Sequence, residues 1–371
     1  MRPVALLGAL VAVLSASVLL QAGQARPPAA ATAPPQPARK LKVLVLCDME
    51  GVSRATDVAH TEFSHPAEYA SGREALTDDV NAAIAGLKAA GVEEIVVVDG
   101  HGSGNTTEPD VIEQRLLAPA KMIERENSFD IYMDSYDQSF DGVVAVAMHA
   151  GAGNLSGFLS HTYSGAGREY RVNGVPFNET MILGMGAARL RLPVIMASGD
   201  DHLEKELRRH MPWVQYAAVK HAVDRTKAEP LPPDEVRRRI ETAARTAVER
   251  LDQARLFEMP GPYRFAITFS DEAQARNAAG APGAEAGYNA TTVQVRADDF
   301  EEGYRRSLRL YSLAGLVISQ ANLAAVLAAA PDAAALREKL RDLSDDRFLY
   351  RPLPAASSPS AQPRRPYWGA R

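Results

Sequence analysis

The chain has 371 residues, of which 46% are hydrophobic and 23% are charged, and its formal net charge is −5. This ordinary globular composition suffices for one large domain or two smaller ones, and the lack of a long basic stripe argues against a nucleic-acid partner. Cys47 is the only cysteine, which excludes an intrachain disulfide and a zinc site built on several cysteines.

The N-terminal segment has the pattern of an export signal. Arg2 precedes an apolar stretch over residues 4–20, and Gly23 and Ala25 place small side chains at a cleavage site. We therefore predict a signal peptide over residues 1–25 and a periplasmic or secreted bacterial protein with no stable membrane span after cleavage. The alternative is a retained single-pass anchor, because the stretch is near the lower length limit of a spanning helix.

Two proline-rich segments flank the predicted folded body. Residues 26–39 are rich in proline and alanine, and this composition predicts a disordered tether between the signal and the body. Residues 351–371 are rich in proline and serine and predict a disordered tail. The folded body is therefore expected over residues 40–350.

Within the body, apolar runs of strand length alternate with helical patterns. Pro66 stands in the first turn of one predicted helix, Asn173-Gly174 indicates a hairpin, and Asp201 with Glu204 has the spacing of a capping box. The other predicted strands cover residues 41–47, 95–98, 143–147, 194–197, 214–219, 264–269 and 291–295, and the helices cover 66–90, 179–190, 233–251 and 298–327.

The alternation of strands and helices predicts an α/β fold. We expect a mixed, largely parallel sheet flanked by helices, followed by a smaller, partly antiparallel second lobe that begins at about residue 191. In open sheets of this kind, binding sites form beyond the carboxyl ends of the strands.

Carboxylates and imidazoles stand where several of these strands end. Asp48 and Glu50 follow the first strand and project on the same side, because residues i and i+2 of a strand share a face. His101 and His149 follow two other strands, and Glu179 opens a helical stretch. Together they offer enough oxygen and nitrogen ligands for two zinc-class ions. From the residues alone, a metal site and an ordinary set of polar strand ends remain equally open.

Five ordered motifs resemble the DppA-type D-aminopeptidase family. They are Asp48-Met49-Glu50-Gly51-Val52-Ser53, Asp99-Gly100-His101, His149-Ala150, Ser160-His161-Thr162, and Asn173-Gly174 followed by Asn178-Glu179. The similarity extends from about Lys42 to Leu316, and the family consists of binuclear zinc peptidases that release N-terminal D-amino acids from short peptides. Gly102 and Asn178 depart from the residues that the family commonly has, serine and glycine respectively.

The resemblance implies a role for each site residue. Asp48 would bridge two zinc ions per chain, and Glu50, His101, His149 and Glu179 would complete the two ligand sets. His161 would be the catalytic histidine, which the family assigns as the nucleophile. Zinc lowers the pKa of bound water to about 7, so a metal-bound hydroxide is the stronger candidate nucleophile. His161 would then either carry protons or polarise the tetrahedral intermediate. The family's ring assemblies imply a homo-oligomer.

Other polar residues have less specific interpretations. Lys220 is either a strand-end lysine or a group that binds the substrate carboxylate, and Asn154 is either a turn residue or an oxyanion donor. His60 and His65 lie after Glu50 and are either surface residues or part of the substrate entrance.

The sequence therefore favours a zinc-dependent aminopeptidase acting on short peptides with N-terminal, chiefly D-, residues. Peptidoglycan fragments are the natural supply of such peptides outside the cytoplasm. Two alternatives remain: another binuclear metal amidohydrolase, and a non-catalytic periplasmic protein that binds peptides or metal.

Overall fold

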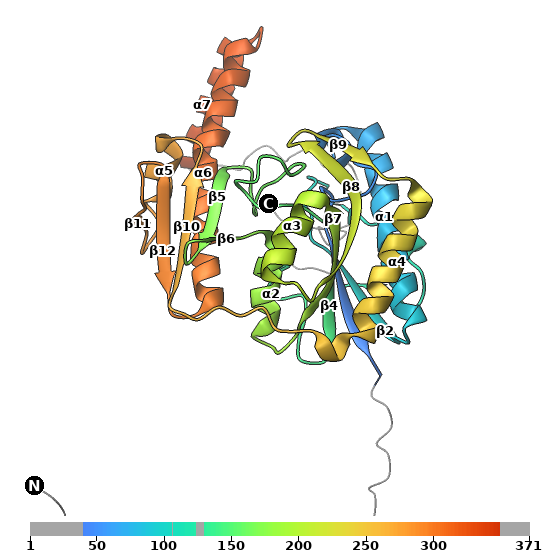
Figure 1. Ribbon diagram of the computed structural model, residues 1–371. Coiled ribbons are helices and arrows are strands. Elements are labelled where there is room, and N and C mark those ends of the chain that lie inside the picture. The colour runs from blue at the N-terminus through green and yellow to red at the C-terminus, as the bar shows by residue number, and fades with distance from the viewer. Residues whose placement is uncertain (1–39, 106, 124–129, 349–371) are drawn as a thin grey trace, which may run out of the picture. The chain divides into compact units, whose positions relative to one another are not determined.

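The computed structural model describes residues 40–105, 107–123 and 130–348. Its larger sheet has seven strands in the order β3-β2-β1-β4-β7-β8-β9. All neighbouring pairs are parallel except the last, β8 with β9 (Figure 1). The strands are β1 (Lys42–Cys47), β2 (Glu94–Asp99), β3 (Lys121–Met122), β4 (Gly142–Met148), β7 (Val194–Asp200), β8 (Gln215–Asp224) and β9 (Lys227–Pro230).

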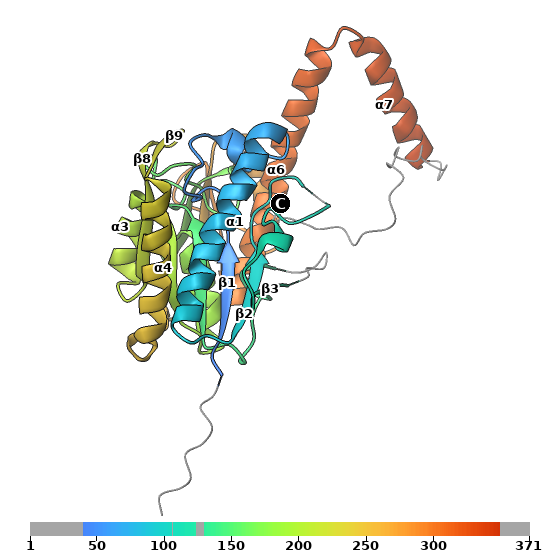
Figure 2. The ribbon, with the colours of Figure 1, turned by 90° about the vertical axis from the view of Figure 1, so that its right-hand side faces the viewer.

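Both faces of this sheet are covered at its centre, which explains why β1 and β4 are continuous apolar runs rather than alternating patterns. Val43 and Val45 pack into a core with α1 (Pro66–Ala89) and α4 (Pro233–Glu249), and these two helices lie side by side (Figures 1 and 2). Leu44 and Leu46 face the opposite way, into a core shared with α2 (Glu179–Ala188) and α3 (Asp201–His210).

A second, five-stranded sheet has the order β11-β12-β10-β5-β6, and its paired strands are antiparallel. Helices α5 (Glu272–Ala278) and α6 (Phe300–Ala329) pack against it, and its apolar face joins the core that contains Leu44. The strands are β5 (Gly167–Val172), β6 (Val175–Pro176), β10 (Tyr263–Phe269), β11 (Glu285–Ala286) and β12 (Thr292–Ala297). The described part of the chain thus has the predicted α/β fold, with a mixed, largely parallel sheet and a smaller antiparallel one.

The predicted start of the second lobe, at about residue 191, is wrong. Strands β7, β8 and β9 follow residue 191 but extend the larger sheet, whereas β5 and β6 precede it and belong to the smaller sheet. Strand β5 pairs with β10, which lies about ninety residues later in the chain. The sequence pattern identifies each strand but not its hydrogen-bonded neighbour, so the order along the chain misled the prediction.

The local signals were largely correct. Helix α1 begins at Pro66, and the hairpin at Asn173-Gly174 joins β5 to β6. The N-cap of α3 is Asp200 rather than Asp201, because Asp200 accepts hydrogen bonds from the backbone N–H groups of His202 and Leu203. The sequence pattern did not indicate α5, the helix α7 (Ala333–Phe348), or the short 3-10 helices η1 (Val58–Thr61), η2 (Glu113–Arg115) and η3 (Leu251–Gln253).

Helix α6 is the one helix in the described residues with the length and apolar composition of a membrane span. Its first half packs against the smaller sheet through buried residues such as Tyr304 and Leu310. Leu316, Leu323 and Val326 in its second half are exposed. The predicted signal peptide, tether and tail lie outside the described residues.

Candidate metal centre

The structure brings the six predicted site residues to the carboxyl edge of the larger sheet. The close approach of the first motif to β4 helps to explain its glycine: a Cβ atom at Gly51 would lie 2.0 Å from the carbonyl oxygen of Met148. The backbone N–H of Gly51 donates to the carbonyl of Ala147 at 2.8 Å. Asp48 and Glu50 follow β1, His101 follows β2, His149 follows β4, His161 lies in the loop before β5, and Glu179 opens α2.

The ligand atoms of these residues form overlapping groups, within each of which they lie within 4.8 Å of one another. His149 Nε2 is 3.3 Å from Asp48 Oδ2 and 3.6 Å from Glu179 Oε2. His101 Nε2 is 3.4 Å from Glu50 Oε1. The groups are Asp48–His149–Glu179, Asp48–Glu50–His101 and Glu50–His149–His161. Asp48, Glu50 and His149 each belong to two groups, so the groups form one continuous cluster.

Several polar atoms in this cluster are buried without a hydrogen bond. They are Asp48 Oδ2, Glu50 Oε2 and His149 Nε2. Because buried polar groups nearly always have partners, such atoms call for an explanation. Two carboxylate oxygens and an imidazole nitrogen are ligands that zinc accepts, so the donor set fits a zinc site.

The charges of the cluster shift its pKa values in opposite directions. Burial and the neighbouring Glu50 raise the pKa of Asp48 to about 7. Burial opposes the ionised form of Glu179 too, but the charge of His149 outweighs it and lowers the pKa of Glu179 to about 2. The carboxylates in turn raise the pKa of His149 despite its burial. The positive charges of the His101 and His149 rings therefore offset the negative charges of the carboxylates, and a bound divalent cation would supply that positive charge instead.

Each histidine of the site is held through its second nitrogen. His149 Nδ1 lies 2.9 Å from the carbonyl oxygen of Ala150, and His161 Nδ1 lies 2.9 Å from that of Leu159. A carbonyl only accepts hydrogen bonds, so Nδ1 carries a proton in both rings, and Nε2, which faces the cluster, offers a lone pair whenever the ring is neutral. The geometry thus selects the tautomer that binds a metal or takes up a proton.

The side chain of Asp110 binds the second nitrogen of His101. Its Oδ2 atom lies 2.9 Å from His101 Nδ1, while its other oxygen accepts hydrogen bonds from Ser103, at 2.6 Å, and from Tyr69. Carboxylates in this position orient metal-binding histidines and increase their basicity. Sequence reasoning missed Asp110, because nothing in its local pattern shows that the loop after β2 folds back to His101.

His161 differs from the other five residues in exposure. Its side chain is 20% exposed, whereas those of the other five are at most 10% exposed. Its ring stacks on that of His149, with centroids 4.1 Å apart. Burial and the nearby charge of His149 lower the pKa of His161. A neutral imidazole that faces two carboxylates and remains accessible can accept a proton from a bound reactant.

Glu179 is fixed by neighbours that the sequence did not reveal. Tyr132 donates a hydrogen bond to one of its oxygens, and the backbone N–H of Tyr163 donates to the other at 2.6 Å. The preceding residue, Asn178, caps α2 by accepting from the N–H of Met181, and it donates to Glu206 at 2.8 Å. Asn178, one of the two departures from the family pattern, therefore supports the helix that presents Glu179.

Glu206 links two segments that carry site residues. Besides Asn178, it accepts hydrogen bonds from the N–H of Gly151, two residues after His149, and from the side chain of Asn154. Because the amide of Asn154 is bound to Glu206, the structure favours its interpretation as a loop residue over that as an oxyanion donor. His60 lies in η1, where its partly buried ring is 3.3 Å from Asp57.

The interpretation of Lys220 as a group that binds the substrate carboxylate is wrong. Its side chain is completely buried, and its ammonium group donates hydrogen bonds to backbone carbonyls instead of facing an open cavity. Burial lowers the pKa of Lys220 to about 7.

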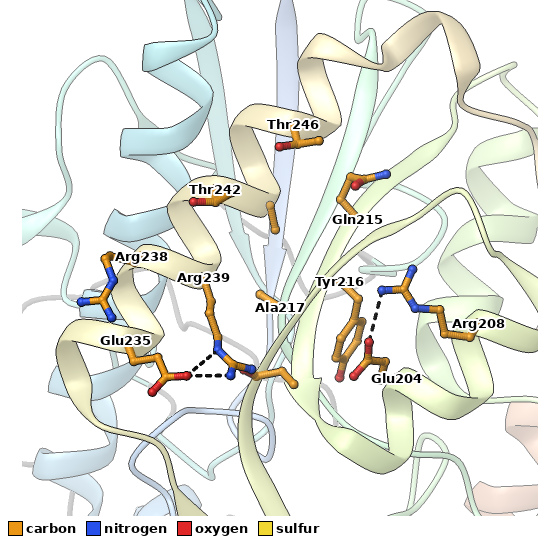
Figure 3. A pocket seen from close by; sticks show the side chains of 12 residues that line it. Glu204, Arg208, Gln215, Tyr216, Ala217, Glu235, Arg238, Arg239, Thr242 and Thr246 are labelled. Carbon is orange, nitrogen blue, oxygen red and sulfur yellow. Dashed lines mark hydrogen bonds and ion pairs between the residues drawn. The ribbon is translucent and has the colours of Figure 1, made fainter.

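The groove in Figure 3 is separate from this cluster. It has a volume of about 640 Å³ and lies between α3, β8 and α4, and none of the six site residues lines it. Its charged side chains largely neutralise one another: Arg239 pairs with Glu235 at 2.6 Å, and Arg208 pairs with Glu204 at 3.2 Å. The groove offers no catalytic group comparable to the histidine–carboxylate cluster.

Comparison with known proteins agrees with the resemblance seen in the sequence. A family model described as D-aminopeptidase matches residues 41–308. A D-aminopeptidase of Bacillus subtilis (strain 168) is 28% identical over 274 residues, which cover 74% of this chain and 98% of that protein. A solved structure, described as the Zn-dependent D-aminopeptidase DppA from Bacillus subtilis, a self-compartmentalizing protease, matches with a TM-score of 0.67. Its sequence identity is 28%, and the match covers 74% of this chain and 98% of that one. The chain belongs to the D-aminopeptidase family and is a hydrolase of the metallopeptidase class.

Proposed function

We propose that the protein is a two-zinc aminopeptidase that releases N-terminal D-amino acids from short peptides. The observation that carries the proposal is the overlap of two ligand groups at Asp48, one with Glu50 and His101 and one with His149 and Glu179. Five buried ligands with one shared carboxylate suit a pair of metal ions, which in two-metal sites lie about 3.5–4 Å apart. The zinc dependence of the similar Bacillus protein supports the choice of metal.

The protein's own residues supply proton transfer. Zinc, when bound, polarises the scissile carbonyl and acidifies water. His161 faces the carboxylates of Glu50 and Glu179 at 3.9 Å and 3.8 Å, beside the ligand groups. It takes a proton from the attacking water and delivers one to the leaving amine as the peptide C–N bond breaks. Burial, the main cause of its lowered pKa, favours the neutral imidazole that the first of these steps needs.

Turnover of matched peptides tests this proposal. Zinc-loaded protein should release D-alanine from D-Ala-D-Ala and from D-Ala-p-nitroanilide and should act far more slowly on the L-isomers. Equal turnover of both isomers would contradict the D-preference, and hydrolysis of other amides alone would favour a different amidohydrolase. Zinc binding without any turnover would favour a binding protein instead.

We further propose that the protein works outside the cytoplasm on peptides derived from peptidoglycan. The support is the export pattern of residues 1–25 and the D-amino acids that such fragments contain. Mass spectrometry of the native protein should find a mature N-terminus at or near Arg26. An intact Met1 in a membrane fraction would show that the apolar stretch is an anchor.

A further inference from the structure

Lys220 is an unusual residue for a protein interior. It stands in β8, its side chain is 0% exposed, and it is among the largest fully buried side chains in the described residues. Lysine is almost never fully buried unless its charge is paired or its hydrogen-bonding capacity is satisfied. The partners of its ammonium group therefore indicate why the residue is there.

All three partners belong to one loop. Lys220 Nζ donates hydrogen bonds to the carbonyl oxygens of Glu50 at 2.5 Å, Val52 at 2.9 Å and Ala55 at 3.1 Å. An ammonium group has three N–H donors, so this loop uses its full capacity. The ring of Phe158 lies 4.1 Å from Nζ and offers a cation–π contact.

The same loop is also held from α1. Asp79, which is buried, accepts hydrogen bonds from the backbone N–H and the hydroxyl of Ser53, each at 2.8 Å. Residues 50–55 are thus held between a lysine that binds their carbonyls and an aspartate that binds Ser53. Strand β1 stops at Cys47, and the larger sheet holds this loop at Gly51, whose N–H donates to the carbonyl of Ala147 in β4 at 2.8 Å.

The position of the Glu50 carboxylate depends on this loop, whereas the carboxylates of Glu179 and Asp48 accept hydrogen bonds that fix them directly. Glu179 receives hydrogen bonds from Tyr132 and Tyr163, and Asp48 Oδ1 accepts one from the N–H of Met49. Within the described part of the chain, the close partners of the Glu50 carboxylate are the rings of His101 and His161. Its backbone therefore fixes where its carboxylate lies.

We propose that Lys220 is a positioning residue: by gathering the carbonyls of Glu50, Val52 and Ala55, it holds Glu50 in place for the metal that it shares with His101. This inference rests on the proposed two-metal site. The group of Asp48, His149 and Glu179 has supports of its own in β4, α2 and Tyr132, and none of these contacts involves Lys220. Loss of Lys220 should therefore affect the two metal positions unequally.

The test is zinc binding by the Lys220→Met variant, which keeps an unbranched side chain that is one atom shorter and removes the charge and the donors. Zinc content and affinity are measured by competition with a chelator, separately from peptide turnover. We expect one zinc to bind as in the wild type and the second to bind at least about tenfold more weakly, the size of effect typical of residues that orient metal ligands. Retention of both zinc ions at wild-type affinity would overturn the proposal.

Two control variants separate positioning from a general loss of stability. Lys205→Met changes an exposed lysine of α3 in the same way and should leave both zinc ions bound. Leu207→Ala truncates a buried residue of α3 away from the loop, and it should lower the melting temperature without selective loss of one zinc. Equal and selective zinc loss in Leu207→Ala would show that Lys220 acts only through stability.

A second variant covers the case in which Lys220→Met does not fold. Lys220→Gln keeps two N–H donors without the charge and should weaken the same zinc to a smaller degree; unchanged affinity would again refute the proposal. Wild-type protein that binds two zinc ions but cleaves no peptide would remove the proposed function and leave this inference standing. Wild-type protein that binds no zinc would remove both.

Discussion

Replacing Asp110 with asparagine should weaken zinc binding through His101 without touching a ligand. Asp110 is 1% exposed, and its two oxygens serve His101 on one side and Ser103 and Tyr69 on the other. Asparagine has one oxygen and one NH₂ group in their place. If the NH₂ group faces His101, the Nδ1 atom must give up its proton, which moves to Nε2 and blocks the metal-binding lone pair. If the NH₂ group faces Ser103 and Tyr69 instead, the hydroxyls of these two residues lose their hydrogen-bond acceptor.

The expected loss is 10–100-fold in zinc affinity, as found for partners of metal-bound histidines. At about 1.4 kcal/mol per factor of ten, this corresponds to roughly 1.4–2.8 kcal/mol. Competition with a chelator measures it directly. Glu108→Gln is the matched control, because Glu108 lies in the same loop but is an exposed partner of Arg73 at 3.2 Å. Zinc affinity of Asp110→Asn within twofold of wild type, or an equal loss in Glu108→Gln, would refute the reasoning.

Three further outcomes are expected. His161→Ala should keep its zinc and lose about 10²–10⁴-fold in kcat, as for a positioned acid–base group; steady-state kinetics with a rate within a few-fold of wild type would assign His161 a structural role. Asn178→Ala should lower the free energy of unfolding by about 0.5–2 kcal/mol, because the N-cap bond to Met181 is lost; an unchanged denaturant midpoint would contradict this. The protein should form a homo-oligomer, by analogy with the self-compartmentalizing Bacillus enzyme; light scattering at micromolar concentration that shows a monomer would remove this expectation.

The amino-acid sequence determined the elements of this protein and the residue types at its candidate site. The run from Lys42 to Cys47 is apolar at almost every position because both faces of β1 are buried, and a strand of that kind is recognisable without knowledge of its neighbours. The carboxylates and imidazoles that follow such strands could be expected at one edge of the sheet, since parallel strands end together. The ordered motifs then indicated which of the eight histidines to choose.

Only the tertiary structure decided which segments are neighbours. The pairing of β5 with β10 places β5 in the smaller sheet, although it precedes the predicted boundary at residue 191. The sequence could not show this pairing, because the backbone groups of a strand can form hydrogen bonds with any other strand. The contacts of Lys220 with Glu50, of Asp110 with His101 and of Glu206 with Asn178 were likewise invisible. A lysine or a carboxylate in a sequence predicts an exposed charge. Only the folded structure shows which backbone group or ring the charged side chain contacts, and Lys220 and Glu50 are 170 residues apart in the sequence.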